Sequence, residues 1–109
     1  MRMNSRQRVL AALNHREPDR SPCDLGSTTA TGIHPVAYGR LKRHLGLSTP
    51  SELLSARAQL ARVEQEIIER FGLDLLPLIP ASAAEVPEMD DEQTYVDRWG
   101  VQRQLPKVV

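Results

Sequence analysis

The sequence has little cysteine, few aromatic side chains, no surplus of charge and no long apolar run. Its 109 residues contain one cysteine, Cys23, which excludes an internal disulfide and a metal site of several thiolates from this chain alone. One Trp, two Tyr and one Phe predict a mainly aliphatic core. Fourteen Lys and Arg balance 14 Asp and Glu, which disfavours nucleic acid or an anionic membrane as a partner. Because no segment has the apolar length of a signal peptide or a membrane span, we expect a cytoplasmic protein.

The stretch 21–34, SPCDLGSTTATGIH, is where the composition of the chain changes most abruptly. Residues 21–25 predict a short strand, and the glycine and hydroxyl residues of 26–32 are typical of a loop. A helix is expected to follow, with Pro35 in its first turn. A strand that delivers a carboxylate to such a loop, at the start of a helix, is typical of a ligand-facing βα turn.

Apolar residues recur at helical spacing in three segments, which predict helices at residues 5–14, 35–45 and 49–71. The third has the clearest start, because Thr49 to Glu52 reads as a capping box with a proline in the first turn. Its apolar stripe then runs in steps of three or four as far as Phe71, and Gly72 is expected to end it.

Three later segments complete the expected order: a strand at 73–80, an acidic loop at 81–94 and a strand or hairpin at 95–102. The first of them, LDLLPLIP, is a nearly continuous apolar run, typical of a strand buried on both faces. The hairpin is expected to turn at Gly100. The order helix, strand, helix, helix, strand predicts two parallel strands in a sheet that needs more partners, and so an incomplete protein.

The candidate substrate-binding residues lie in or beside the loop: Asp24, Ser27, Thr28, Thr29, Thr31 and His34. Asp24 has two interpretations, a carboxylate that contacts substrate or moves a proton, and a cap of the glycine loop. The loop either cradles an anion with its amides or is a surface loop of small residues. It is not a Walker phosphate loop, because no lysine follows. His34 either points into the site or caps the helix.

Four further residues receive structural interpretations. Cys23 is expected to be a buried small hydrophobe rather than a nucleophile. Trp99 is expected to anchor packing under a turn, with a ligand platform as the alternative. His15 and His44, which lie near helix ends beside arginines, are expected to be solvated.

The segments RVLAALNHREPDRSPCDLGSTTATGIH, AYGRLKRHLGL and DRWG together resemble the N-terminal part of the uroporphyrinogen decarboxylase family, particularly the branch near cobalamin-dependent methyltransferases. The resemblance spans most of the chain and is strongest in RVLAALNHREPDR. It implies an α/β fold, the (β/α)8 TIM barrel. Residues 1–109 would hold an incomplete N-terminal part of one such domain: a leading helix, the first one or two βα units and a partial hairpin.

The resemblance also bears on the chemistry. Decarboxylases of the family follow the first strand with an Arg-Gln-Ala-Gly-Arg arrangement that grips an acidic tetrapyrrole, whereas DLGSTTATGIH contains no arginine. Asp74 stands at the start of the second expected strand, whereas the decarboxylases carry their essential aspartate at its far end. The methyltransferase branch uses zinc to activate a thiol and a corrinoid to carry the methyl group. Its metal ligands would lie later in the barrel, so we expect no metal or cofactor within this chain.

We therefore expect part of a methyl-transferring enzyme of this family, with no catalytic residue assigned in this chain. Its partners would be a small-molecule substrate, a corrinoid protein and the remainder of the barrel. One alternative is uroporphyrinogen decarboxylation in tetrapyrrole biosynthesis. The other is a non-catalytic helical binding or assembly module. The chain alone is expected to be inactive, because two or three strands cannot close a barrel.

Overall fold

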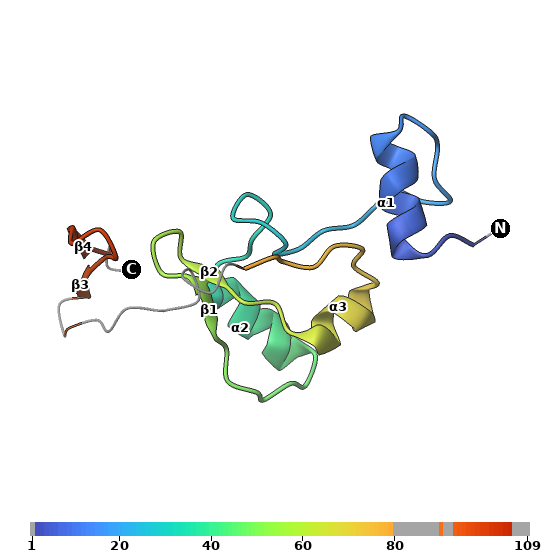
Figure 1. Cartoon of the computed structure of the whole chain (residues 1–109). Coiled ribbons are helices and arrows are strands. Elements are labelled where there is room, and N and C mark those ends of the chain that lie inside the picture. Colours follow the sequence, from blue (N-terminus) through green and yellow to red (C-terminus); the bar gives the residue numbers. More distant parts are fainter. Residues whose placement is uncertain (1, 80–89, 91–92, 106–109) are drawn as a thin grey trace.

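The computed structural model describes residues 2–79, 90 and 93–105, and this part of the chain has a mixed α/β structure (Figure 1). Its helices are α1 (Ser5–Leu13), α2 (Pro35–His44) and α3 (Gln65–Phe71). Its strands are β1 (Leu53–Ser55), β2 (Leu60–Ala61), β3 (Thr94–Val96) and β4 (Gln102–Gln104). They form two antiparallel pairs, β1 with β2 and β3 with β4. None of these helices is both long and apolar enough to cross a membrane.

The helices at 5–14 and 35–45 are confirmed, and local capping explains where they begin. The Asn4 side chain accepts a hydrogen bond from the Gln7 amide, and the Gln7 side chain accepts one from the Asn4 amide, which is a complete capping box. At the start of α2, Nδ1 of His34 accepts a hydrogen bond from the Val36 amide at 3.2 Å. Pro35 occupies the first turn, where its missing N–H costs nothing.

The single helix predicted for 49–71 is wrong. Strands β1 and β2 occupy its first half as a hairpin, and α3 begins only at Gln65. The hairpin forms because its backbone finds partners elsewhere: the Ala61 amide donates to the Ile33 carbonyl at 2.8 Å. Tertiary pairing therefore overrides a helical pattern of apolar residues. The end of the helix is confirmed, since Gly72 adopts a left-handed φ of 60°.

The core lies between α2, β2 and α3. Tyr38, Ala61, Val63 and Ile67 are buried in it, and apolar residues of the 25–33 segment and of α2 pack around them. It is aliphatic apart from Tyr38, whose side chain is completely buried. By contrast, Arg8 is the one buried residue of α1, whose Leu13 is 70% exposed.

A polar cluster tethers this core to the loop before β1. Lys42 is only 2% exposed, and its Nζ lies 2.8 Å from Oε2 of Glu64 and 2.6 Å from the Thr49 carbonyl oxygen. The Tyr38 hydroxyl donates to the same Glu64 carboxylate at 3.2 Å and accepts from the Glu64 amide at 2.9 Å. Lys42 chiefly holds the pKa of the Glu64 carboxyl below its usual value. Among the residues that the structure describes, no buried side-chain polar atom lacks a hydrogen-bond partner, as a stable interior requires.

The predicted strands at 21–25 and 73–80 do not form a regular ladder. The two segments nevertheless run alongside each other in the same direction (Figure 1), and the Asp74 amide donates to the Cys23 carbonyl at 2.8 Å. Burial of 73–80 on both faces is wrong for its described residues, because Leu76 is 64% and Leu78 96% exposed. Pro77 has no amide to donate to a ladder. Pro80 and most of the loop predicted at 81–94 lie outside the described residues.

The prediction of a hairpin turning at Gly100 is confirmed. Strand β3 pairs with β4 in the register Tyr95 to Arg103, and Gly100 takes a φ of 76° in the turn. Oδ1 of Asp97 accepts from the Trp99 and Val101 amides at 2.9 and 3.0 Å. Trp99 is 75% exposed, so its prediction as a packing anchor is wrong. Trp99 lies in the exposed turn of the hairpin, and the described contact of its ring is with the Arg98 guanidinium, 4.9 Å from the ring centroid.

Candidate functional site

The predicted ligand loop begins at Asp24, whose carboxylate closes the first turn of that loop. Oδ1 accepts a hydrogen bond from the Ser27 amide at 3.1 Å, and Oδ2 accepts one from the Ser27 hydroxyl. Of the two interpretations of Asp24, the geometry matches the cap. Ser27 is half-buried, so its hydroxyl is committed to this carboxylate.

Hydrogen bonds within the loop also engage its threonines. The hydroxyls of Thr28 and Thr31 are 3.1 Å apart, and each accepts a backbone amide of the loop at 3.2 Å, from Ala30 and Thr28 respectively. The Gly26 amide donates to the Thr31 carbonyl at 2.8 Å and closes the ring. These amides therefore bind partners inside the loop and do not form an anion cradle. Thr29 is exposed at the tip of the loop, outside the hydrogen bonds described here for its neighbours.

The base of the loop rests on the segment that contains β2. A Cβ added at Gly32 would lie 2.7 Å from Cδ2 of Leu60, and one added at Gly26 would lie 2.7 Å from Cγ2 of Val63. The loop therefore needs glycine at these two positions for close approach. His34 follows, and its described hydrogen bond is the α2 cap. The structure thus brings together two pairs of the predicted site residues, Asp24 with Ser27 and Thr28 with Thr31. The described hydrogen bond of His34 is to the Val36 amide and involves neither pair.

A second cluster, which sequence reasoning missed, centres on Arg8 of α1. Its guanidinium contacts Asp19 through two hydrogen bonds, Nε to Oδ1 at 2.7 Å and Nη2 to Oδ2 at 3.0 Å. Nη1 donates to Oδ1 of Asp74 at 2.6 Å, and Nη2 also donates to the Met3 carbonyl at 2.6 Å. The bond to Asp19 holds the pKa of the Arg8 guanidinium above its usual value, and Arg8 in turn lowers the pKa of the Asp19 carboxyl. One buried cation thus joins segments 66 residues apart.

Asp74 is the anionic centre of this cluster, and its side chain is completely buried. Arg20 donates to both of its carboxylate oxygens, at 2.8 and 3.2 Å. Burial raises the pKa of the Asp74 carboxyl, whereas the hydrogen bond from the Cys23 amide lowers it. Bonds from Ser5, Arg8 and Arg20 lower it further, to about 2. Asp74 is therefore an ionised, fully paired carboxylate at neutral pH, unsuited to donate a proton.

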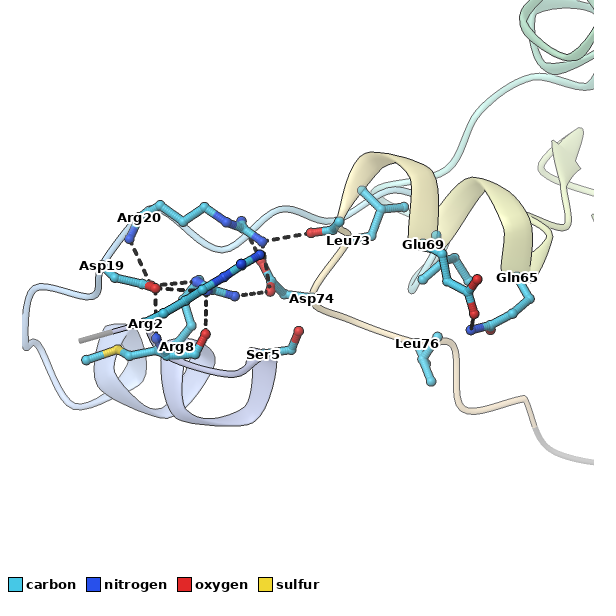
Figure 2. Close-up of a pocket in the computed structure, with 13 residues that line it drawn as sticks. Arg2, Ser5, Arg8, Asp19, Arg20, Gln65, Glu69, Leu73, Asp74 and Leu76 are labelled. Atoms are coloured by element: carbon cyan, nitrogen blue, oxygen red, sulfur yellow. Dashed lines mark hydrogen bonds and ion pairs between the residues drawn. The ribbon is translucent and has the colours of Figure 1, made fainter. Parts of the chain in front are cut away.

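A hollow of about 610 Å³ opens beside this cluster, between the first residues of α1 and α3 (Figure 2). Figure 2 shows Ser5, Arg8 and Asp74 on one wall, with Gln65 and Glu69 of α3 across from them. Arg8 and Asp74 on the first wall bind each other, and Arg2 also lines the hollow on the side of α1. A signal for this cluster was present in the sequence, because Asp74 interrupts the apolar run LDLLPLIP. A lone charge in such a run indicates a buried ion pair.

Cys23 and the other side chains that could bind a metal ion do not form a further site in the described part of the chain. Cys23 is exposed, so its prediction as a buried hydrophobe is wrong: the cluster holds its backbone while the thiol faces solvent. Among the described residues, no group of three or more His, Cys, Asp or Glu is placed to hold a metal ion. Comparison with known proteins finds no matching family model, curated protein or solved structure.

Proposed function

We propose that this chain is the N-terminal portion of a uroporphyrinogen decarboxylase-like (β/α)8 barrel protein, of the methyl-transfer branch. In this proposal residues 21–25 and 73–79 are the first two barrel strands. The loop between Asp24 and His34 lines one side of the barrel mouth, where its side chains orient a small-molecule substrate.

The observation that carries the proposal is the placement of these two segments. They lie side by side, joined by the bond from the Asp74 amide to the Cys23 carbonyl, and the chain between them contains α2 and α3. That order, an extended segment, a helical crossover and a second extended segment running the same way, is typical of a βαβ unit. The exposure of Leu76 and Leu78 fits a strand whose next neighbour is supplied by another part of a barrel.

Charge supports methyl transfer over decarboxylation of a tetrapyrrole. The loop from Asp24 to His34 carries no lysine or arginine, whereas a polyacidic substrate needs cationic groups to hold its carboxylates. The nearby arginines, Arg8 and Arg20, are bound to Asp19 and Asp74. The carboxylate of Asp74 is bound in return, so it is not a free group at the barrel mouth.

The residues that the structure describes do not by themselves form a zinc site. The described part of the chain has no group of side chains placed to hold a metal ion, and Cys23 is the single cysteine of the sequence. In the proposal the zinc ligands and the chemical step belong to the remainder of the barrel, together with a corrinoid protein as partner. The role left to the loop is substrate orientation, with Asp24 holding its shape.

The functional test uses the complete protein encoded at this locus. Purified with zinc, it is assayed for demethylation of methylcobalamin by a thiol, followed by the corrinoid spectrum, and for carbon dioxide release from uroporphyrinogen. The proposal predicts thiol-dependent demethylation and no carbon dioxide. Carbon dioxide release without demethylation would establish the decarboxylase alternative, and neither activity would refute the proposed chemistry.

A separate test addresses the stand-alone module. A barrel portion with an unpartnered strand is expected to self-associate as its concentration rises, and Leu78→Lys is expected to weaken this association. Sedimentation velocity measures both, with Leu13→Lys as a matched change at another exposed apolar position. A wild-type chain that stays monomeric at high concentration would favour the module.

A further inference from the structure

We propose that Asp74 is a positioning residue for the loop between Asp24 and His34, acting through the backbone of Cys23. The inference rests on the proposed function only in taking this loop as the one that faces the ligand.

Asp74 holds Cys23 from both of its backbone groups. The Cys23 amide donates to Oδ2 of Asp74 at 2.9 Å, and the Asp74 amide donates to the Cys23 carbonyl at 2.8 Å. The residue after Cys23 is Asp24, whose carboxylate fixes the first turn of the loop through Ser27. The position of Asp24 therefore depends on a carboxylate 51 residues away from Cys23 in the sequence.

The other anchors of the loop are apolar or backbone contacts at its base and end. Gly26 rests against Val63, and the Ile33 carbonyl accepts from the Ala61 amide at 2.8 Å. The Asp74 bonds hold the chain one step earlier, at Cys23, before Leu25 and Gly26 reach the core. Loss of the Asp74 carboxylate should thus loosen the chain at Cys23 and Asp24 while the end of the loop stays in position.

The same carboxylate also binds α1, which couples the helix to the loop. Arg8 of α1 donates to Oδ1 of Asp74, and the Cys23 amide donates to Oδ2. Asp19 binds Arg8 equally closely, yet its described contacts do not include Cys23. Asp19 is therefore the matched control: its removal loosens α1 and leaves the Cys23 bonds in place.

The test is hydrogen–deuterium exchange of the full 109-residue chain at micromolar concentration, read by mass spectrometry on peptides covering 23–32, α1 and the β3–β4 hairpin. Asp74→Ala is expected to speed exchange in 23–32 by about tenfold, the factor that loss of one such bond implies. Asp19→Ala is expected to speed exchange in α1 and leave 23–32 within about twofold of wild type. The hairpin, which contacts neither residue, should be unchanged in both.

A conservative variant separates the two roles of the carboxylate. Asp74→Asn keeps an oxygen that can accept from the Cys23 amide but loses the charge that binds Arg8. It should restore protection of 23–32 and leave α1 loosened. If Asp74→Ala loses its helical circular dichroism, Cys23→Pro takes its place, because it removes the amide that donates to Asp74 and leaves Arg8 bound to that carboxylate. It should speed exchange in 24–32 and leave α1 at the wild-type rate, and unchanged exchange in 24–32 would overturn the inference.

The inference is overturned if Asp74→Ala leaves 23–32 unchanged, if both alanine variants speed it equally, or if Asp74→Asn restores no protection there. In the complete enzyme the same role predicts a KM raised more than kcat is lowered by Asp74→Ala. The exchange result does not depend on the family. If the complete protein shows the expected exchange pattern but has no methyl-transfer activity, the proposed function is refuted and this inference stands.

Discussion

Replacing Tyr38 with phenylalanine removes one hydroxyl from the centre of the core and leaves its shape unchanged. That hydroxyl accepts the Glu64 amide at 2.9 Å and donates to the Glu64 carboxylate at 3.2 Å. Burial raises the pKa of Tyr38, so the hydroxyl keeps its proton and makes both bonds at neutral pH. In Tyr38→Phe the Glu64 amide, which lies just before α3, loses its partner at a part-buried position beside the buried Tyr38 ring.

An unpaired donor at such a part-buried position costs about 1 kcal/mol, because it has given up part of its hydration without gaining a protein partner. For a domain of this size, that lowers the melting temperature by roughly 5 °C. Urea unfolding followed by circular dichroism at 222 nm measures the free energy of unfolding from the helices. Trp99 fluorescence is unsuitable, since that side chain is exposed in the separate β3–β4 hairpin.

Tyr95→Phe supplies the matched control. Tyr95 is also buried, at 5% exposure, but no side-chain hydrogen bond of its hydroxyl is described. The same chemical change there is expected to alter the free energy of unfolding by less than about 0.5 kcal/mol. Equal effects of the two substitutions would refute the reasoning that the Tyr38 hydroxyl joins α2 to α3.

Three further predictions follow from particular residues. The pKa of Asp74 is about 2 in the folded chain, against an ordinary value of 3.8. The contribution of this carboxylate to stability is therefore present above pH 3.8 and is lost as the pH falls towards 2. Over this pH range the urea midpoint of Asp74→Asn should fall less steeply than that of the wild-type chain. Gly32→Ala should destabilise by about 1–3 kcal/mol through its clash with Leu60, whereas Gly39→Ala, in open space on α2, should be neutral or stabilising in the same urea assay. The exposed Trp99 should emit at the wavelength of a solvated indole and be quenched by acrylamide; a blue-shifted, protected emission would contradict its placement.

Features that depend on residues close in sequence could be predicted. The limits of α1 and α2 follow from the capping box at Asn4, and from His34 with Pro35. The β3–β4 hairpin follows from the alternation around Gly100. In each case the hydrogen bonds that decide the structure join residues a few positions apart, so the pattern contains the reason for the fold.

The remaining features depend on partners that the pattern does not contain. The spacing of apolar residues in 53–63 suits a helix, and a bond from Ala61 to Ile33 decides for a hairpin. In the candidate site, the residue types of the loop were informative about a turn, but not about hydroxyls that bind one another. The pairing of Arg8 with Asp74 spans 66 residues and left only one sequence signal, a charge within an apolar run.

The measurement that tests the central proposal most directly is the sequence of the encoding locus through and beyond the codon for Val109. The barrel proposal predicts an open reading frame that continues for the remaining strands and helices, with a histidine and paired cysteines late in it as zinc ligands. A stop codon directly after Val109 would contradict it. The chain would then be a remnant or a small binding module, and the catalytic proposal would fall.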